Sequence, residues 1–279
     1  MFRKVTDNIH IMDYDDDKAR PLLALIKGRE ASLIVDAGNS DTHAKEFIDY
    51  VKSSGTENAE YLAITHWHWD HIYGINYMNL TTLGSEKTKQ KIGRMNDILR
   101  GKERAKIEEE NTVAKLSGLF EEHGRVKNID ISFDRIARVN LGNITCVLEC
   151  LGGDHASDST LIYVEEEKVM FLGDMPYRGF EGKYRTHHFE QVKRLRDEIM
   201  KYDCEKFFTA HKEMYTREEM SELLNTMTEI GGIVDDSIEY EKSEKEFIEV
   251  YGRKPDEDEE FFMRAYIDGN IYNKENKIK

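Results

Sequence analysis

Cysteine and long apolar runs are scarce in this sequence. Three of the 279 residues are cysteine, and no two of them form a Cys-x-x-Cys pair. An odd number of cysteines without such a pair favours reduced thiols over a disulfide framework. Cys146 and Cys150 lie four positions apart in a strand-like segment, so we expect both on one face as small core residues. No window reaches the ~18 consecutive apolar residues of a membrane-spanning helix, and we expect no membrane association.

Positive charge is also in short supply, which limits the partners to expect. The chain carries 40 basic and 55 acidic residues, a formal net charge of −15. A strongly acidic surface opposes binding to phosphate backbones, and no basic patch interleaved with aromatic residues offsets it. We therefore expect a small-molecule ligand rather than a nucleic acid. The first residues lack the apolar stretch of a signal peptide, so we expect a cytoplasmic protein.

The most informative feature is the run His-Trp-His-Trp-Asp-His at positions 66–71, which directly follows an apolar, strand-like segment. Three imidazoles and a carboxylate within six positions make a dense set of metal ligands, suited to zinc and also to iron or manganese. A chain that leaves a strand projects alternate side chains to one side, so His66 and His68 are expected to reach one ion. Asp70 and His71 follow the turn and are expected to reach a second ion nearby.

Three further candidate ligands stand at or beside the ends of predicted strands. His155 lies in a glycine-rich stretch before a strand, Asp174 ends the apolar run 169–173, and His211 ends the run 207–210. Such positions gather side chains from distant segments of the chain at one edge of a sheet. We therefore expect these three residues to complete the metal set.

This ordered set of motifs resembles the metallo-β-lactamase-fold hydrolase superfamily. The resemblance covers about residues 5–212 and includes an Asp-Ala-Gly turn at 36–38 after a predicted strand. It implies an α/β fold, the αβ/βα four-layer sandwich, and two divalent metal ions, with zinc expected and iron or manganese as alternatives. It also implies a division of the ligands, in which His66, His68 and His155 hold one ion, Asp70, His71 and His211 hold the other, and Asp174 bridges the two.

The predicted elements along the chain are α/β in character. Strands are predicted at 8–12, 22–27 and 31–35, followed by a helix whose N-cap is Ser40. The highly charged segment 85–125 predicts an insertion of two or more helices. This insertion would either cover the metal cleft or pack on the outer face of the sheet.

After His211 the sequence becomes helical and acidic. We therefore predict a catalytic domain over residues 1–212 and a helical C-terminal extension over 213–279. The extension would either complete a lid or mediate assembly into a homo-oligomer. Its tip, residues 273–279, is expected to be disordered.

Helix boundaries within the extension can also be predicted. Thr216 begins a capping box, and the pair Gly231-Gly232 is expected to end the helix that follows. Another helix is predicted over 243–251. A third is predicted after Pro255, where acidic residues fill the first turn.

The resemblance also implies a chemistry. Two divalent ions would activate a shared water as a nucleophile near neutral pH, with Asp70 orienting the water and relaying its proton. We thus expect a hydrolase that cleaves a small-molecule ester, lactone or thioester, from a glyoxalase II-like or lactonase-like branch. Tyr177 resembles the tyrosine with which the lactonase branch assists at the scissile carbonyl; the alternative is a packed loop residue. An iron-containing redox or oxygen-sensing protein on this fold, and a phosphodiesterase, stay open as alternatives.

The remaining histidines lack comparable neighbours in the sequence. His10, His43 and His123 are expected on the surface. His187 and His188 are expected either on the surface or near the mouth of the site.

Overall fold

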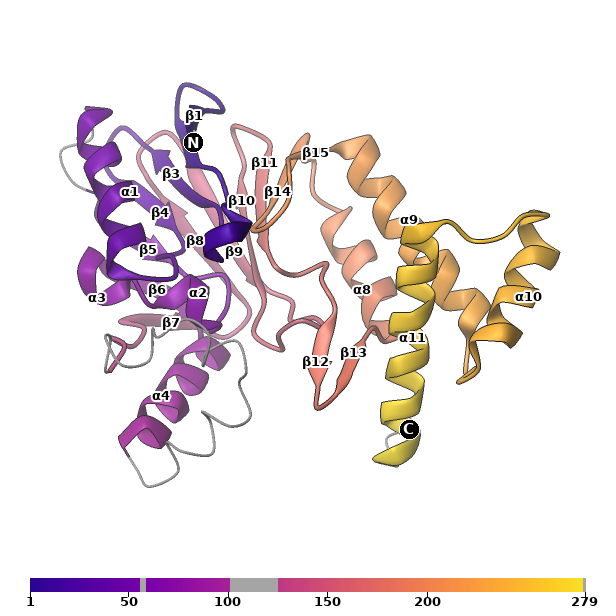
Figure 1. The fold of residues 1–279 in the computed structure, drawn as a ribbon. Helices are drawn as coiled ribbons and strands as arrows, with labels where there is room; N and C mark the ends of the chain where they lie inside the picture. The colour runs from indigo at the N-terminus through magenta and orange to yellow at the C-terminus, as the bar shows by residue number, and fades with distance from the viewer. Residues whose placement is uncertain (56–58, 101–124, 278–279) are drawn as a thin grey trace.

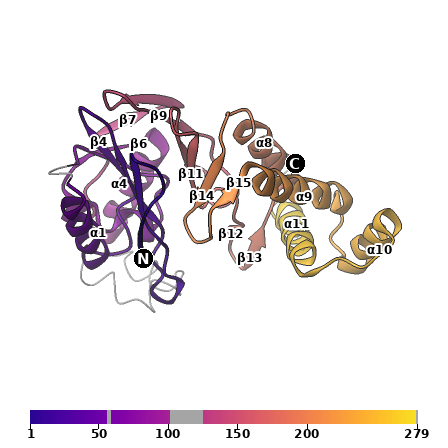
Figure 2. The ribbon, with the colours of Figure 1, turned by 90° about the horizontal axis from the view of Figure 1, so that it is seen from above.

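The computed structural model describes residues 1–55, 59–100 and 125–277. Two β-sheets pack face to face, and helices cover the outer face of each sheet (Figures 1 and 2). The layers run helix, sheet, sheet, helix, which confirms the predicted αβ/βα four-layer sandwich. The predicted second helix of the insertion, and His123 with it, lie outside the described residues.

The first sheet has seven strands that lie in sequence order. Neighbouring strands are antiparallel from β1 to β4 and parallel from β4 to β7. Parallel neighbours need a crossover, usually a helix, and helices α1 to α4 lie in these connections. The elements are β1 (Phe2–Lys4), β2 (Ile9–Met12), the 3-10 helix η1 (Asp16–Lys18), β3 (Leu23–Lys27), β4 (Ser32–Val35), α1 (Asp41–Ser53), β5 (Tyr61–Ala63), α2 (Trp69–Ile72), α3 (Ile75–Met78), β6 (Thr81–Ser85), α4 (Glu86–Arg100) and β7 (Ile131–Phe133).

The second sheet has six strands in the order β15-β14-β11-β10-β9-β8. Only β11 and β14 are parallel neighbours, and the chain between them forms a hairpin and then helix α8. The elements are β8 (Ile136–Asn140), β9 (Thr145–Cys150), β10 (Thr160–Val164), β11 (Val169–Gly173), the hairpin of β12 (Gly179–Glu181) and β13 (Tyr184–Thr186), α8 (Phe189–Ile199), β14 (Lys206–Thr209) and β15 (Tyr215–Thr216).

Three apolar clusters fill the spaces between the layers. Successive residues of a strand face opposite sides of its sheet, and β4 illustrates the result. Leu33 joins the cluster between the two sheets, whereas Ile34 joins the cluster beneath the helices of the first sheet. Both side chains are fully buried, and burial of one such side chain stabilises the fold by about 1.5–3 kcal/mol. A strand that is buried on both faces therefore appears in the sequence as an unbroken run of apolar residues.

All three cysteines are free thiols, as predicted. Cys146 is buried in the cluster between the sheets, and burial raises the pKa of its thiol to about 12. Cys150 is only half-buried, because it ends strand β9 where the chain leaves the sheet. In the part of the chain that the structure describes, no helix combines the length and the apolar character needed to cross a membrane.

The C-terminal segment is helical, as predicted. Its helices are α9 (Arg217–Val234), α10 (Tyr240–Tyr251) and α11 (Glu257–Glu275). Thr216 and Glu219 form the capping box of α9, and Asp256 caps α11 in the same way. Helix α11 runs on to Glu275, so the expectation of disorder from residue 273 is wrong for the first residues of that tip. Its last turn continues to pack near strand β13, where Tyr184 donates a hydrogen bond to Glu275 (2.9 Å).

The prediction that Gly231-Gly232 ends a helix is wrong. Helix α9 continues through both glycines to Val234. A Cβ on Gly231 would lie 2.7 Å from Cδ2 of Phe189 and 2.8 Å from Cζ of Tyr266. Gly231 is therefore the point at which α9 meets α8 and α11 without space for a side chain. The glycine serves a helix crossing rather than a helix end, and this contact is not visible in the local sequence.

The two glycines give a matched pair of stability variants. We expect Gly231→Ala to lower the free energy of unfolding by about 1–3 kcal/mol, since the added methyl group overpacks the crossing. The Gly232→Ala variant adds the same group on the exposed side, 3.9 Å from Phe189. That change is expected to raise the free energy of unfolding by up to about 1 kcal/mol, because alanine is the better helix former. Urea unfolding of both variants checks this, and effects of the same sign would contradict it.

Candidate metal centre

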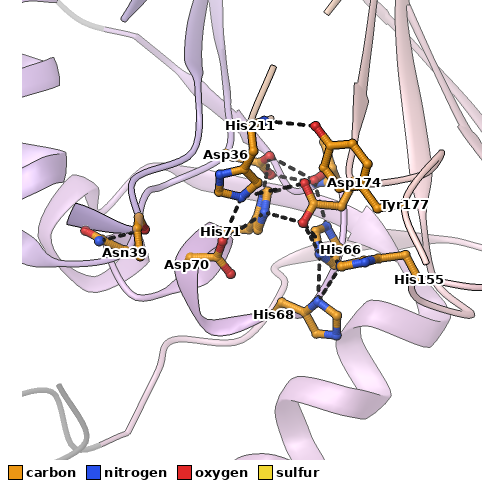
Figure 3. Close-up of polar contacts among 12 residues, drawn as sticks. Asp36, Asn39, His66, His68, Asp70, His71, His155, Asp174, Tyr177 and His211 are labelled. Atoms are coloured by element: carbon orange, nitrogen blue, oxygen red, sulfur yellow. Dashed lines mark hydrogen bonds and ion pairs between the residues drawn. The ribbon is translucent and has the colours of Figure 1, made fainter. Parts of the chain in front are cut away.

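The seven predicted ligands lie together where strands of both sheets end (Figure 3). They come from segments far apart in the sequence: the turn after β5 together with α2, the loop between β9 and β10, the end of β11 and the end of β14. The side chains fall into two groups. Within each group, the donor atoms all lie within 4.8 Å of one another. The structure thus brings together all of the residues that the sequence predicted as ligands.

The first group consists of three imidazoles, those of His66, His68 and His155. Nδ1 of His68 lies 3.0 Å from Nε2 of His66 and 2.8 Å from Nε2 of His155. Nitrogen ligands stand about 2.0–2.1 Å from a zinc ion, which places two of them roughly 3.3 Å apart around a tetrahedral centre. The spacing of the three nitrogens is close to that value.

The second group consists of Asp70, His71, Asp174 and His211. Oδ2 of Asp70 lies 3.5 Å from Nε2 of His71 and 3.2 Å from Nε2 of His211. Helix α2 begins at Trp69, so Asp70 and His71 lie in its first turn. Oxygen and nitrogen donors in this mixture suit a borderline divalent ion.

Asp174 lies between the two groups and faces both. Its Oδ2 is 3.2 Å from Nε2 of His155 and 3.6 Å from Nε2 of His71. Its Oδ1 is 3.8 Å from Nε2 of His211. One carboxylate is thus within reach of ligands from both groups, as a bridging residue would be.

Two imidazoles of the first group, those of His66 and His68, are kept neutral by their surroundings. Burial lowers the pKa of His66 well below its ordinary value, and neighbouring histidines lower it further. Burial likewise lowers the pKa of His68 to about 3. A neutral imidazole offers a lone pair, and only that form binds a metal. His66 and His68 are therefore ready to accept a cation near neutral pH.

The second group carries more negative charge. Burial opposes a charged His71, but Asp70, Asp36 and Asp174 outweigh it and raise the pKa of His71 well above its ordinary value. Burial would raise the pKa of Asp174, yet His155 and His71 hold it well below the usual range. Burial would also raise the pKa of Asp70, but His71 and His211 lower it. Both carboxylates are thus ionised near neutral pH, and they provide charge that would compensate a divalent ion.

Two buried atoms of the second group lack a hydrogen-bond partner. Among the described residues, Nε2 of His71 and Oδ1 of Asp174 are buried and unsatisfied. Leaving such atoms unpaired is unfavourable, and both atoms face the space that the ligands enclose (Figure 3). A divalent ion that displaced the proton of His71 would coordinate both atoms, so the residues present fit the metal ions that the motifs predicted.

Further side chains hold the ligand rings in place. Asp36 Oδ2 lies 2.7 Å from Nδ1 of His71, and the same carboxylate accepts hydrogen bonds from the backbone N–H and hydroxyl of Thr65 (both 2.8 Å). Asp36 directly follows β4 and has a φ of 58°. From the sequence, Asp36 was predicted only as part of a turn. A carboxylate at the end of a predicted strand was the feature that could have indicated a role in the site. Its contact with His71 was not predictable, because the two residues lie 35 positions apart in the sequence.

We expect Asp36→Asn to weaken binding of the ion at the second group about 10–100-fold, the usual effect of removing an outer carboxylate–histidine contact. Asparagine tolerates a positive φ, so the turn should persist while the negative charge facing His71 is lost. Competition with a chromophoric chelator measures the affinity. The control is Asp49→Asn, which removes an exposed carboxylate on α1. An affinity equal to that of the control would show that Asp36 has no such role.

Tyr177 lies beside the ligands but its hydroxyl is already bonded. The phenol donates to Oγ1 of Thr209 (2.9 Å) and accepts from the backbone N–H of His211 (3.2 Å). Its ring centre lies 6.2 Å from that of His155 and 6.3 Å from that of His211. Burial raises the pKa of the phenol, which therefore stays protonated near neutral pH.

The prediction of surface positions for the other histidines is partly wrong. His43 is fully buried on the inner face of α1, and burial lowers its pKa to about 3. Its Nδ1 accepts the backbone N–H of Asn39 (3.4 Å). His187 is also buried, whereas His10 and His188 are half-buried. Both His187 and His188 contact Asp154, the neighbour of the ligand His155, which agrees with the alternative of a place near the site.

The structure is thus a four-layer α/β sandwich with two groups of candidate metal ligands at one end of its sheets. The sequence profile of the Metallo-beta-lactamase superfamily matches residues 23–211. The chain therefore belongs to the metallo-beta-lactamase superfamily. No curated protein matches the sequence.

Solved structures show the same fold. A metallo-beta-lactamase from Pontibacter korlensis aligns with a TM-score of 0.56 and 14% identity, covering 81% of this chain and 98% of that one. The metallo-beta-lactamase DIM-1 is similar, with a TM-score of 0.56, 15% identity, and 81% and 97% of the two chains covered. The stereoselective inverting sec-alkylsulfatase Pisa1 from Pseudomonas sp. aligns over 98% of this chain, with a TM-score of 0.64 and 13% identity. The present chain spans half of that sulfatase.

Proposed function

We propose that the protein is a metal-dependent hydrolase that cleaves a small-molecule ester, lactone or thioester by means of water. The convergence of His66, His68 and His155, and of Asp70, His71 and His211, on the shared carboxylate Asp174 carries this proposal. Seven ligands exceed what one four-coordinate ion needs, and two ions are the simplest occupants. The nitrogen and oxygen donors favour zinc.

The proposed roles follow from the contacts of each residue. Bound divalent ions would lower the pKa of a water and polarise the oxygen of the scissile group. Asp70 would orient the attacking water and accept its proton. The side chain of Asp70 is 13% exposed and that of Asp174 is 6% exposed, so Asp70 is better placed to exchange that proton with solvent.

Tyr177 would donate its hydroxyl hydrogen to the oxygen on which charge develops, in place of Thr209. We expect Tyr177→Phe to lower kcat about 10–100-fold, less than the loss of a metal ligand, because one donor among several is removed. Steady-state kinetics at constant metal content measure this. The matched variant is Tyr163→Phe, which removes the hydroxyl of a buried tyrosine that donates to the carbonyl of Asp203 and is not one of the residues around the ligands. Equal kcat in the two variants would assign Tyr177 to packing.

We further assign residues 1–212 to the catalytic domain and 213–279 to an extension. The family match at 23–211 supports this division. Cytoplasmic location and self-association through the C-terminal helices stay predictions. Because the likeness to an alkylsulfatase extends over nearly the whole chain, sulfate esters are to be tested beside carboxylic esters.

Elemental analysis of protein purified without added metal or chelator tests the proposal first. About two zinc or manganese ions per chain, together with turnover of an ester, lactone or thioester that EDTA abolishes, would support it. Iron accompanied by oxygen consumption and no hydrolysis would overturn it in favour of the redox alternative. Turnover of bis(4-nitrophenyl) phosphate alone would favour the phosphodiesterase.

A further inference from the structure

The hairpin of β12 and β13 is positioned by the C-terminal helix α11 (Figure 1). The backbone N–H of Arg185 donates to Oδ2 of Asp268 (3.0 Å), and that of His187 donates to the carbonyl of Ala265 (2.9 Å). Any side chain at Gly269 would collide with the carbonyl oxygen of His187. The close backbone approach therefore fixes the hairpin on the helix.

The same hairpin borders the metal centre. The carbonyl of Arg178, just before β12, accepts a hydrogen bond from Nδ1 of His155 (3.2 Å). The ring of Phe180 lies 6.2 Å from the ring of His155, centre to centre. A substrate held at the ligands would thus have the hairpin as its neighbour on the His155 side.

Two guanidinium groups lie over aromatic rings at this border. Arg178 lies 3.7 Å from the ring centre of Phe261, and Arg185 lies 4.3 Å from that of Phe180. Phe180 is 61% exposed and Phe261 is 41% exposed, so both rings reach solvent. We call these four residues the two-arginine surface.

Within the described parts of the chain, neither guanidinium forms an ion pair with a carboxylate. The guanidinium of Arg185 donates to the carbonyl of Tyr184 (3.3 Å), Asp268 accepts the backbone N–H of Arg185, and Glu181 lies 3.6 Å from Nε2 of His188. Burial and the charge of Arg185 lower the pKa of Arg178, and the charge of Asp268 opposes this only in part. Asp268 therefore offsets only part of the positive charge of two half-buried guanidinium groups, neither of which pairs with it directly. A second anion would stabilise them further.

We propose that the two-arginine surface binds a carboxylate at the far end of the substrate, so that the substrate class is an acidic ester, lactone or thioester. This inference rests on the proposed hydrolase function. The guanidinium fork matches a carboxylate in shape and charge. The exposed ring of Phe180 is near both Arg185 (4.3 Å) and the ring of His155 (6.2 Å), so an apolar chain lying along it would link the carboxylate to the bond that is cleaved.

A pair of chain-matched esters tests this specificity. Mono(4-nitrophenyl) adipate carries a terminal carboxylate where 4-nitrophenyl hexanoate carries a methyl group. We expect the metal-loaded wild type to prefer the adipate by more than about 10-fold in kcat/KM, and Arg178→Gln/Arg185→Gln to lose most of that preference. The control is Arg138→Gln, which removes an exposed arginine of β8 that pairs with Glu165. This variant should keep the wild-type ratio. A wild-type ratio near one, or an unchanged ratio in the double variant, would overturn the inference.

A binding measurement separates this inference from the hydrolase proposal. Titration calorimetry of adipate into EDTA-treated protein needs neither metal nor turnover. We expect wild type and Arg138→Gln to bind adipate and the double variant to bind it at least about 10-fold more weakly. Absence of turnover with this binding intact would refute the hydrolase but leave the acidic ligand. Equal adipate binding in all three proteins, or none in wild type, would refute the two-arginine surface alone.

Discussion

His68→Ala is expected to lower metal-dependent hydrolysis by more than about 100-fold and to reduce the metal content of the purified protein. Nδ1 of His68 lies within 3.0 Å of the nitrogens of both His66 and His155, so it is the central donor of the first group. Loss of even an outer partner of a ligand commonly weakens metal binding about 10–100-fold, and loss of a ligand itself should exceed that.

The fold should survive the change. His68 is half-buried at a loop position before α2, and it contributes to none of the three apolar clusters. Urea unfolding in EDTA should therefore give nearly the wild-type midpoint, which separates metal loss from misfolding. His10→Ala is the control, since that half-buried histidine bonds to Tyr50 away from the centre. Wild-type turnover and metal content in His68→Ala would remove the basis of the assignment.

The sequence predicted this centre because its ligands are concentrated in recognisable local positions. Four of them lie within residues 66–71, and His155, Asp174 and His211 each stand near a strand end. The strands could also be predicted, since strands buried on both faces appear in the sequence as unbroken apolar runs. Local chemistry also placed the capping box at Thr216 correctly.

Features that depend on contacts between distant segments were not predictable in this way. Gly231 looks like a helix end, but it permits a helix crossing with Tyr266, a residue of α11. His43 looks like an exposed helical residue, yet it faces Met12 across the layer boundary at 3.2 Å. The two-arginine surface joins a hairpin to a helix more than 70 residues later. Each depends on tertiary packing, which overrides local pattern.

Asp174→Asn is expected to reduce metal loading from two ions per chain to about one and to lower hydrolysis by more than about 100-fold. The two oxygens of Asp174 face His155, His71 and His211. Asparagine has the same shape but replaces one oxygen with an N–H donor group, which cannot bind a cation. It also removes the negative charge shared between the two groups, so two divalent ions close together would repel each other more strongly.

The control is Asp203→Asn, an exposed carboxylate paired with Lys168. It should keep two ions per chain and wild-type turnover, because it lies on the surface away from the ligands. Elemental analysis and calorimetric zinc titration of both variants measure the stoichiometry. Two tightly bound ions in Asp174→Asn would show that Asp174 is not the bridge, even if turnover fell. One ion in both wild type and the variant would instead show that the two ligand groups do not fill together, and a mononuclear mechanism would follow.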